Sequence, residues 1–505
     1  MNESMVIATL AREGISLALD ADENIKVASK TGKVDTAILT LLKSHKTFLI
    51  TWLKGQVAKN DFLNRIDSTT ELPPSAAQER FFWVEKMNAE NFSAFNLSLV
   101  YLFRGKLNRN ALIHGWQSLV NRHDVLRSLF FETQEGLRVR ISNVTAENQL
   151  KLIKEIDVSF NDELALKKLF SANAEKKFNL INSPLYRVFL IRVDDDTHYL
   201  QIVLHHAIFD GWSGQVLIQD LANFYNGFCN KTSVNLPDLS LNYYECIYQS
   251  LLSDEKKINQ SSQYWQEKLK NAPAHTTLPH EGISNSQLTG ACIDFSFSAD
   301  VRLAIRSLAM QCGVTPYLLL LSVFKLCLAR FIGVDDIVVG SPVANRDDDG
   351  RQNLIGLFVN TLVLRTQLGA EDDIAQFAQK VKSTYLDALT HQCVTFEKIV
   401  EIVNPDRNAH TSPIFQTLFI YHDFAESFDG FDGLKLAPVE QELQSAFYDL
   451  TLQFQDRDDI FQGSILYRAD LYSRTVMEQF VRVYETLLKQ ILLSPQARLQ
   501  EIPLL

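Results

Sequence analysis

Residues 205–213 read His-His-Ala-Ile-Phe-Asp-Gly-Trp-Ser, and they follow the apolar run Tyr-Leu-Gln-Ile-Val-Leu at residues 199–204. A short run of aromatic, β-branched and aliphatic residues favours a largely buried strand. Because side chains alternate between the two faces of a strand, His205 and His206 are expected to point to opposite sides, which argues against a metal site built from both. The sequence therefore predicts one titratable imidazole facing a reaction space at a strand end.

The residues that follow predict a turn and then a helix. Gly211 permits a tight turn, and Ser213 is a candidate N-cap for an amphipathic helix over residues 215–225. The apolar face of this helix would consist of Val216, Leu217, Leu221 and Phe224. Each feature alone has an ordinary structural interpretation, since histidines beside apolar residues are usually core side chains and an Asp-Gly pair is usually a turn. The functional interpretation rests on their combination.

The pattern His-His-x-x-x-Asp-Gly at residues 205–211 resembles the signature of the acyltransferase superfamily related to chloramphenicol acetyltransferase. The added Trp212-Ser213 resembles the condensation domains of nonribosomal peptide synthetases. Further segments resemble other blocks of these domains in the family's order, at residues 74–83, 122–130, 340–346, 355–361 and 391–397. The resemblance spans about residues 72–505.

Two blocks depart from the family pattern. The family usually has tyrosine, aspartate, alanine and tryptophan at alternating positions where this chain has Tyr243, Glu245, Ile247 and Gln249. The block at residues 407–413 keeps its leading arginine and final proline but loses the usual aspartate and inner arginine. These substitutions touch expected structural contacts, whereas the histidine motif is intact.

The resemblance implies an α/β (α+β) fold with two chloramphenicol acetyltransferase-like lobes that form a V around a central tunnel. We place the N-lobe at residues 73–253 and the C-lobe at residues 254–505, after a linker at residues 56–72. The patterns predict helices over residues 110–121, 162–177, 214–228, 299–312 and 316–331, and strands over residues 97–103, 198–204, 337–340 and 360–365. The last residues, Ile-Pro-Leu-Leu at 502–505, are similar to the junction before an adenylation domain, which we expect to follow in a longer synthetase.

Residues 1–55 predict a small α-β-β-α module. Helices are expected over residues 5–12 and 34–53, with a hairpin of strands 15–19 and 24–28 between them. This order resembles the docking domains that begin some synthetase subunits, where a short C-terminal peptide of the upstream subunit adds a strand to the hairpin. Three lysines, Lys26, Lys30 and Lys33, would favour an acidic peptide. The alternatives are a plain N-terminal extension and ordinary solvated lysines.

Composition and residue patterns argue against nucleic acid as a partner and against a membrane span. A net charge of −11 with no long basic run argues against nucleic acid binding. No segment reaches the roughly 20 apolar residues of a membrane span. The six cysteines lack Cys-x-x-Cys spacing, and the N-terminus lacks a signal-peptide pattern, so we expect a cytoplasmic protein with reduced thiols.

The resemblance also implies the chemistry and the partners. Donor and acceptor carrier proteins supply two thioesters on phosphopantetheine arms, so the chain itself is expected to bind no cofactor or metal. His206 matches the family's second histidine, and Gly211 could direct a backbone N–H at the reacting centre. His206 would act either as a general base toward the attacking amine or as a group that orients it.

The remaining site residues are expected to support this centre. Asp210 and His205 are interpreted as structural, with Asp210 in a salt bridge to Arg346 between the lobes. The motif positions that could line the tunnel or position substrate are Arg127, Trp212, Ser213 and Asn360, each with an alternative role in local packing or hydrogen bonding.

Two other functions share this signature. An epimerization domain would use a glutamate as a second acid/base for exchange of an α-proton. A noncatalytic platform would only recruit carrier proteins. The expected N-terminal docking module and Trp212-Ser213 favour condensation.

Overall fold

The computed structural model describes residues 6, 10, 15–19, 24–29, 34–46, 49–50, 70–87, 93–143, 153–158, 162–181, 183–251, 255–281, 288–346, 350–404, 412–422, 430–439, 441, 445–457 and 460–503. The chain divides into two compact units, Met1–Glu71 and Leu72–Leu505. Each unit has a hydrophobic core of its own.

In the first unit, strands β1 (Ile15–Leu19) and β2 (Ile25–Ser29) form the antiparallel hairpin that the alternating pattern predicts. Helix α2 (Thr36–Ser44) contributes to a small core that consists of Val6, Leu10, Ile38, Leu42 and Leu49. Of the predicted lysines, Lys26 is exposed on β2, whereas Lys30 and Lys33 lie outside the described residues, as does nearly all of the predicted linker.

The prediction of one continuous helix over residues 34–53 is wrong in its described part. Helix α2 ends at Ser44, His45 forms a turn, and helical backbone resumes at residue 46. The Ser44 hydroxyl donates to the Leu41 carbonyl at 3.0 Å and so competes with the backbone for that acceptor. The apolar stripe predicted the helical face but not this interruption.

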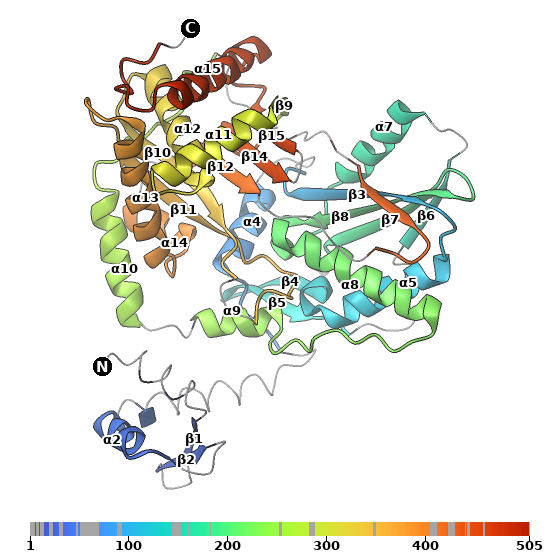
Figure 1. Ribbon diagram of the computed structural model, residues 1–505. Coiled ribbons are helices and arrows are strands. Elements are labelled where there is room, and N and C mark those ends of the chain that lie inside the picture. The colour runs from blue at the N-terminus through green and yellow to red at the C-terminus, as the bar shows by residue number, and fades with distance from the viewer. Residues whose placement is uncertain are drawn as a thin grey trace. The chain divides into compact units, whose positions relative to one another are not determined.

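The first half of the second unit, residues 72–251, is built on a mixed sheet with the strand order β13-β3-β8-β7-β6 (Figure 1). Its own strands are β3 (Asn96–Arg104), β6 (Ile153–Asp157), β7 (Tyr186–Arg192) and β8 (Thr197–His205). Helix α7 (Glu163–Ala174) lies on one face, and α5 (Arg109–Arg122) and α8 (Gly211–Asn230) lie side by side on the other. The remaining elements of this half are α4 (Ala76–Met87), η1 (Asp124–Arg127), the hairpin β4 (Ser128–Thr133) and β5 (Gly136–Ile141), η2 (His206–Ile208) and α9 (Tyr243–Leu251).

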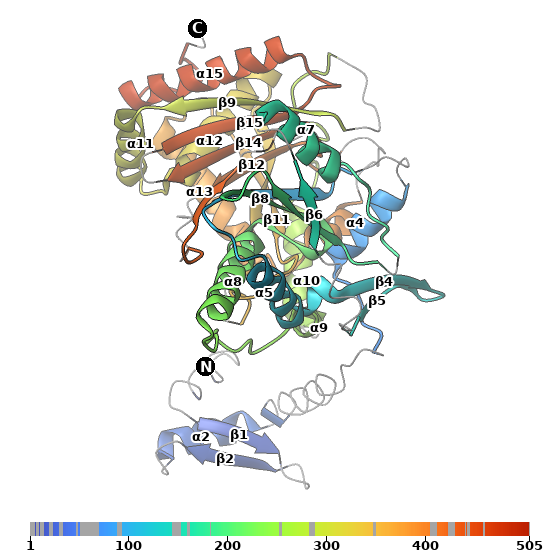
Figure 2. The same cartoon turned by 90° about the vertical axis from the view of Figure 1, so that its right-hand side faces the viewer.

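The second half, residues 255–503, contains a six-stranded sheet with the order β11-β10-β12-β14-β15-β9. These strands are β9 (Gly290–Phe297), β10 (Asp336–Val343), β11 (Asn360–Gln367), β12 (Thr417–His422), β14 (Leu450–Arg457) and β15 (Ile460–Arg468). The helices are α10 (Glu255–Lys268), α11 (Ala299–Gln311), α12 (Pro316–Ile332), α13 (Ile374–Thr390), α14 (Phe396–Val403) and α15 (Arg474–Leu493). Figure 2 shows α15 running along the sheet near β9.

One short strand does not follow the predicted division at residue 254. Strand β13 (Lys435–Pro438) belongs to the second half in sequence but pairs antiparallel with β3, from Lys435 opposite Arg104 to Pro438 opposite Tyr101. Nearby, Asn226 on α8 donates to the Gly430 carbonyl at 3.0 Å. The second half therefore completes the sheet of the first.

Helix α12 lies at the centre of the second core, and all of residues 318–329 are buried. Pro316 at its first position and Gly333 with φ 75° at its C-cap give it well-defined ends. Among the described residues no single helix is both long and apolar enough to cross a membrane, although α11 and α12, bent by 96°, reach that length and apolarity as a pair.

Lys325 is a fully buried lysine in this apolar helix. Its Nζ donates to the carbonyls of Leu364 at 2.5 Å and Ile337 at 3.4 Å and to the Thr366 hydroxyl at 3.1 Å. Burial lowers the pKa of Lys325 from 10.5 to about 7, because the charged form loses its hydration. Hydrogen bonds, rather than an ion pair with a carboxylate, therefore compensate the Lys325 amine for its lost hydration.

We expect this lysine to make stability depend on pH. Between pH of about 7 and 10.5 the unfolded chain holds the Lys325 proton and the folded chain does not, so the free energy of unfolding rises with pH. The slope is at most about 1.4 kcal/mol per pH unit. Chemical denaturation at pH 7 and 9 should show the stability difference between wild type and Lys325→Met shifting in favour of wild type at the higher pH. A difference that does not change with pH would contradict this.

Candidate active site

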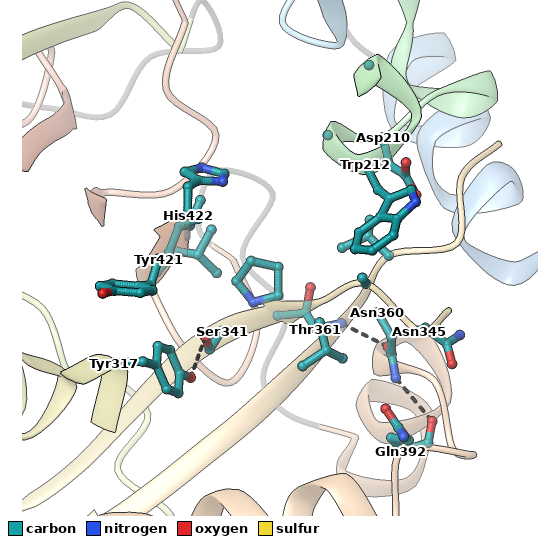
Figure 3. A pocket seen from close by; sticks show the side chains of 18 of the residues that line it. Asp210, Trp212, Tyr317, Ser341, Asn345, Asn360, Thr361, Gln392, Tyr421 and His422 are labelled. Carbon is teal, nitrogen blue, oxygen red and sulfur yellow. Dashed lines mark hydrogen bonds between the residues drawn. The ribbon is translucent and has the colours of Figure 1, made fainter. Parts of the chain in front are cut away.

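A pocket of about 1970 Å³ lies in the second unit and is lined by both halves. The first half contributes α4, β3 and the start of α8, and the second contributes β10, β11, β12, β14 and α13. Figure 3 shows Asp210 and Trp212 on one side and Tyr317 and Tyr421 on the other. The histidine motif therefore opens onto a space between the two halves.

His206 lines this pocket at the point where β8 ends and η2 begins. Its backbone N–H donates to the Phe95 carbonyl at 2.8 Å, and its ring stacks on Phe81 with centroids 4.8 Å apart. Burial lowers the pKa of His206 below the ordinary value of 6.5. The Nδ1 atom is buried and forms no hydrogen bond to another residue in the part of the chain that the structure describes. A neutral ring with these properties can accept a proton from a group in the pocket.

His205 lies in a different environment, as expected, but for another reason. It ends β8 with its side chain fully buried, and its Nε2 lies 2.5 Å from Glu85 Oε2. The two histidines separate because the chain leaves the strand conformation at His206 and enters the 3₁₀ turn, rather than through alternation along one strand. His205 therefore supports the turn and does not line the pocket.

Asp210 forms the predicted salt bridge with Arg346, whose Nη2 lies 2.9 Å and 3.1 Å from the two carboxylate oxygens. Both side chains are buried. Asp210 also accepts from the Ser213 and Phe358 backbone N–H groups at 2.9 Å and 3.0 Å. The Arg346 Nη1 donates to the carbonyl of Leu354 at 2.6 Å. This pair joins the start of α8 to two segments of the second half.

Two of the four residues that were expected to line the tunnel or to position substrate, Ser213 and Arg127, do not line the pocket. Ser213 is not the N-cap of α8, because the helix begins at Gly211 and the Asp210 carboxylate caps it. The buried Ser213 hydroxyl instead lies 2.7 Å from Asp210 Oδ1, behind the pocket wall. Arg127 ends η1, where it donates to the carbonyls of Val120 at 3.1 Å and Ser142 at 3.0 Å. Arg127 therefore has the alternative role, local hydrogen bonding to the backbone.

Three other expected residues do line the pocket. Trp212 donates from Nε1 to the Gln352 carbonyl at 3.0 Å. Asn360 donates to the Gln392 carbonyl at 3.1 Å (Figure 3). It also accepts from the Phe396 backbone N–H, so both ends of its amide are used within the pocket wall. Gly211 begins α8 without a left-handed φ, and an added Cβ would meet nothing within 4 Å. The expected tight turn therefore does not require this glycine.

Several pocket contacts were not predicted. Glu397 pairs with Arg80 at 3.3 Å, and Asp456 pairs with Arg306 at 2.9 Å and accepts from the Tyr421 hydroxyl at 2.8 Å. Arg80 stands in a motif, but nothing in sequence spacing indicates which carboxylate it meets across the pocket. Each of these contacts joins segments that are distant in the chain.

The structure describes the first of the two divergent motif blocks in full and the second only in part. Tyr243 is buried, and its hydroxyl donates to the Leu357 carbonyl at 3.1 Å, next to the pocket wall. Glu245 accepts from the Asn242 backbone N–H at 2.7 Å and so caps its own helix. In the second block, residues 407–411 lie outside the described residues. The departure at Glu245 is therefore accommodated locally.

A family model described as "Condensation domain" matches residues 68–505. Malpinin synthetase of Mortierella alpina is 30% identical over 422 residues, which cover 82% of this chain and 5% of that protein. Tyrocidine synthase 2 of Brevibacillus parabrevis is 28% identical over 440 residues, which cover 86% of this chain and 12% of that protein. The chain thus spans only a small part of the length of these relatives.

Solved structures support the same fold. The X-domain from teicoplanin biosynthesis superposes with a TM-score of 0.79 at 20% identity, covering 87% of this chain and 99% of that one. The starter condensation domain of rhizomide synthetase RzmA gives a TM-score of 0.74 at 18% identity, covering 86% and 98%. These matches confirm the predicted α/β fold of chloramphenicol acetyltransferase type.

Proposed function

The chain belongs to the condensation-domain family of nonribosomal peptide synthetases, and from this premise we propose that it forms an amide bond between two carrier-bound thioesters. The α-amine of the acceptor aminoacyl group attacks the thioester carbonyl of the donor acyl or peptidyl group. Both groups arrive on phosphopantetheine arms of carrier proteins. The observation that carries the proposal is the His206 ring, whose pKa is lowered by burial, in a pocket that both halves line.

The site supports this reaction through position and proton transfer. His206 takes the proton of the attacking amine, the tetrahedral intermediate expels the donor thiolate, and His206 returns that proton to the thiolate. Holding both reactants in one pocket can supply an effective molarity of roughly 10⁵ M or more when they are well oriented. The Asp210–Arg346 pair holds the wall beside this centre without adding net charge to it.

The pocket chemistry disfavours epimerization. Within the part of the chain that the structure describes, the carboxylate side chains that line the pocket are Asp210, Glu397 and Asp456. Each of them is paired with at least one arginine. An arginine partner stabilises the charged carboxylate and makes it a poor second acid/base for exchange of an α-proton.

The test loads a donor acyl group and an acceptor aminoacyl group onto two separate carrier proteins and adds the whole chain. Intact mass spectrometry of the acceptor carrier should show the donor mass transferred to it. Exchange of the acceptor or donor α-proton for deuterium without transfer would instead indicate an epimerase. Carrier binding without either reaction would indicate a platform.

We infer a second, separate role for the first unit. Its hairpin β1–β2 has the two-stranded form to which an extended peptide can add a strand, and Lys26 is exposed on β2. A short acidic C-terminal peptide of an upstream synthetase subunit is the proposed occupant. Backbone hydrogen bonds would supply the affinity and the lysine would favour the acidic sequence.

A further inference from the structure

One face of α4 contacts the turn that presents His206. Gln78, Phe81 and Glu85 are spaced by three and four residues, which places them on the same side of the helix. All three are buried. Gln78 donates to the Ala207 carbonyl at 2.9 Å, and the Phe81 ring stacks on His206. The helix therefore holds both the backbone and the ring of this turn.

Glu85 completes this set through His205. Its Oε2 lies 2.5 Å from His205 Nε2, and the two side chains are 1% and 0% exposed. On the other side of the ring, the Ala207 backbone N–H donates to His205 Nδ1 at 3.1 Å. These two contacts decide where the ring carries its proton.

The hydrogen-bond geometry assigns the proton to Nε2. A nitrogen that accepts from a backbone N–H has no proton of its own, so Nδ1 of His205 is the acceptor of the neutral ring. Nε2 then carries the proton and donates it to Glu85. Because both groups are buried, water offers no replacement acceptor if the carboxylate is removed.

We propose that Glu85 is a positioning residue, which acts on turnover by holding His205 in its Nε2–H form and thereby fixing the η2 turn under His206. With the proton on Nδ1 instead, His205 and the Ala207 N–H would face each other as two donors. The turn would shift, and His206 would leave its place on Phe81. The proposal rests on the proposed function, since it assumes that the position of His206 limits amide-bond formation.

The kinetic test uses the two-carrier assay with Glu85→Ala, Glu85→Gln and a matched control, Glu79→Gln. Glu79 lies on the same helix, is exposed, and contacts Trp83 rather than the turn. We expect Glu85→Ala to lower kcat about 10- to 100-fold with KM for the loaded acceptor carrier unchanged. Glu85→Gln keeps an acceptor oxygen and should recover most of that loss, and Glu79→Gln should match wild type.

A double substitution separates positioning from general support of the fold. If Glu85 acts through His206, Glu85→Ala should cause no further loss in a protein that already carries His206→Ala. A carboxylate that only supports the fold would lower the residual rate of that variant as well. An additive loss, or a loss confined to KM, would overturn the proposal.

A readout independent of turnover distinguishes failure of this inference from failure of the proposed function. In the whole chain labelled with ¹⁵N-histidine, one histidine at pH of about 7 should show an unprotonated Nδ1 and a protonated Nε2. Glu85→Gln should shift these signals and Glu79→Gln should not. The opposite tautomer, or a doubly protonated ring, at the signals that respond to Glu85→Gln would overturn the assignment even if wild type shows no condensation.

Discussion

His206→Ala is expected to lower the rate of amide-bond formation by at least about 100-fold, the lower end of the range for removal of a general acid or base. The ring lines the pocket, and burial lowers its pKa below the ordinary value of 6.5. It is therefore neutral and able to accept a proton at pH 7. Single-turnover transfer between two loaded carriers, followed by intact mass spectrometry, measures the effect.

The pH dependence tests which property of the ring matters. Because burial lowers the pKa of His206 from 6.5, the ratio of wild-type to His206→Ala rate should fall on acidification with a midpoint below pH 6.5. His114→Ala, which removes an exposed histidine on α5 outside the pocket, should leave the rate unchanged. Near wild-type turnover by His206→Ala would show that the His206 ring does not take part in the reaction.

Breaking the Asp210–Arg346 pair is expected to cost about 3 to 5 kcal/mol of unfolding free energy, because either single substitution leaves the other charge buried without its partner. Asp210→Asn tests the loss of charge more specifically than Asp210→Ala does. Asparagine also caps helices, so the start of α8 would keep its cap. Arg346→Met removes the opposite charge with little change in volume. Chemical denaturation of the three proteins measures the loss.

Combining the two substitutions identifies the cause. In the double variant neither charge remains, so its loss should be smaller than the sum of the single losses. Glu401→Gln breaks an exposed pair with Lys398 and should cost less than about 1 kcal/mol. If the losses were additive in the double variant, or if the single variants were as stable as wild type, the Asp210–Arg346 pair would not stabilise this part of the pocket.

Local patterns were sufficient to predict many elements of the second unit. The apolar run before His205 gives β8, and the periodic stretches at residues 299–312 and 316–331 give α11 and α12, whose ends agree within one residue. Apolar spacing and capping residues act over a few neighbours, so one sequence contains them. The hairpin of the first unit was predicted for the same reason.

Contacts between distant segments could not be predicted in this way. Arg127 lies in a motif, yet its guanidinium donates to the carbonyls of Val120 and Ser142. Only the folded path of the chain brings these carbonyls to it. Glu85 looks like one more surface glutamate on α4 until the fold brings it to His205, which is 120 residues away. The N-cap of α8 was misplaced by three residues because Asp210 and Ser213 are both good caps, and only the fold shows that the Asp210 carboxylate accepts from the Ser213 N–H.

Strand β13 has a consequence for exchanging parts of this protein between synthetases. It is the outermost strand of the first half's sheet, and it is encoded more than 150 residues after that half ends. A graft of residues 73–253 alone would leave β3 as an exposed edge that invites pairing with another chain. A chimaera joined at the boundary between the halves would therefore need a β13 from one parent that pairs well with β3 from the other. A good sequence match at the junction would not be sufficient.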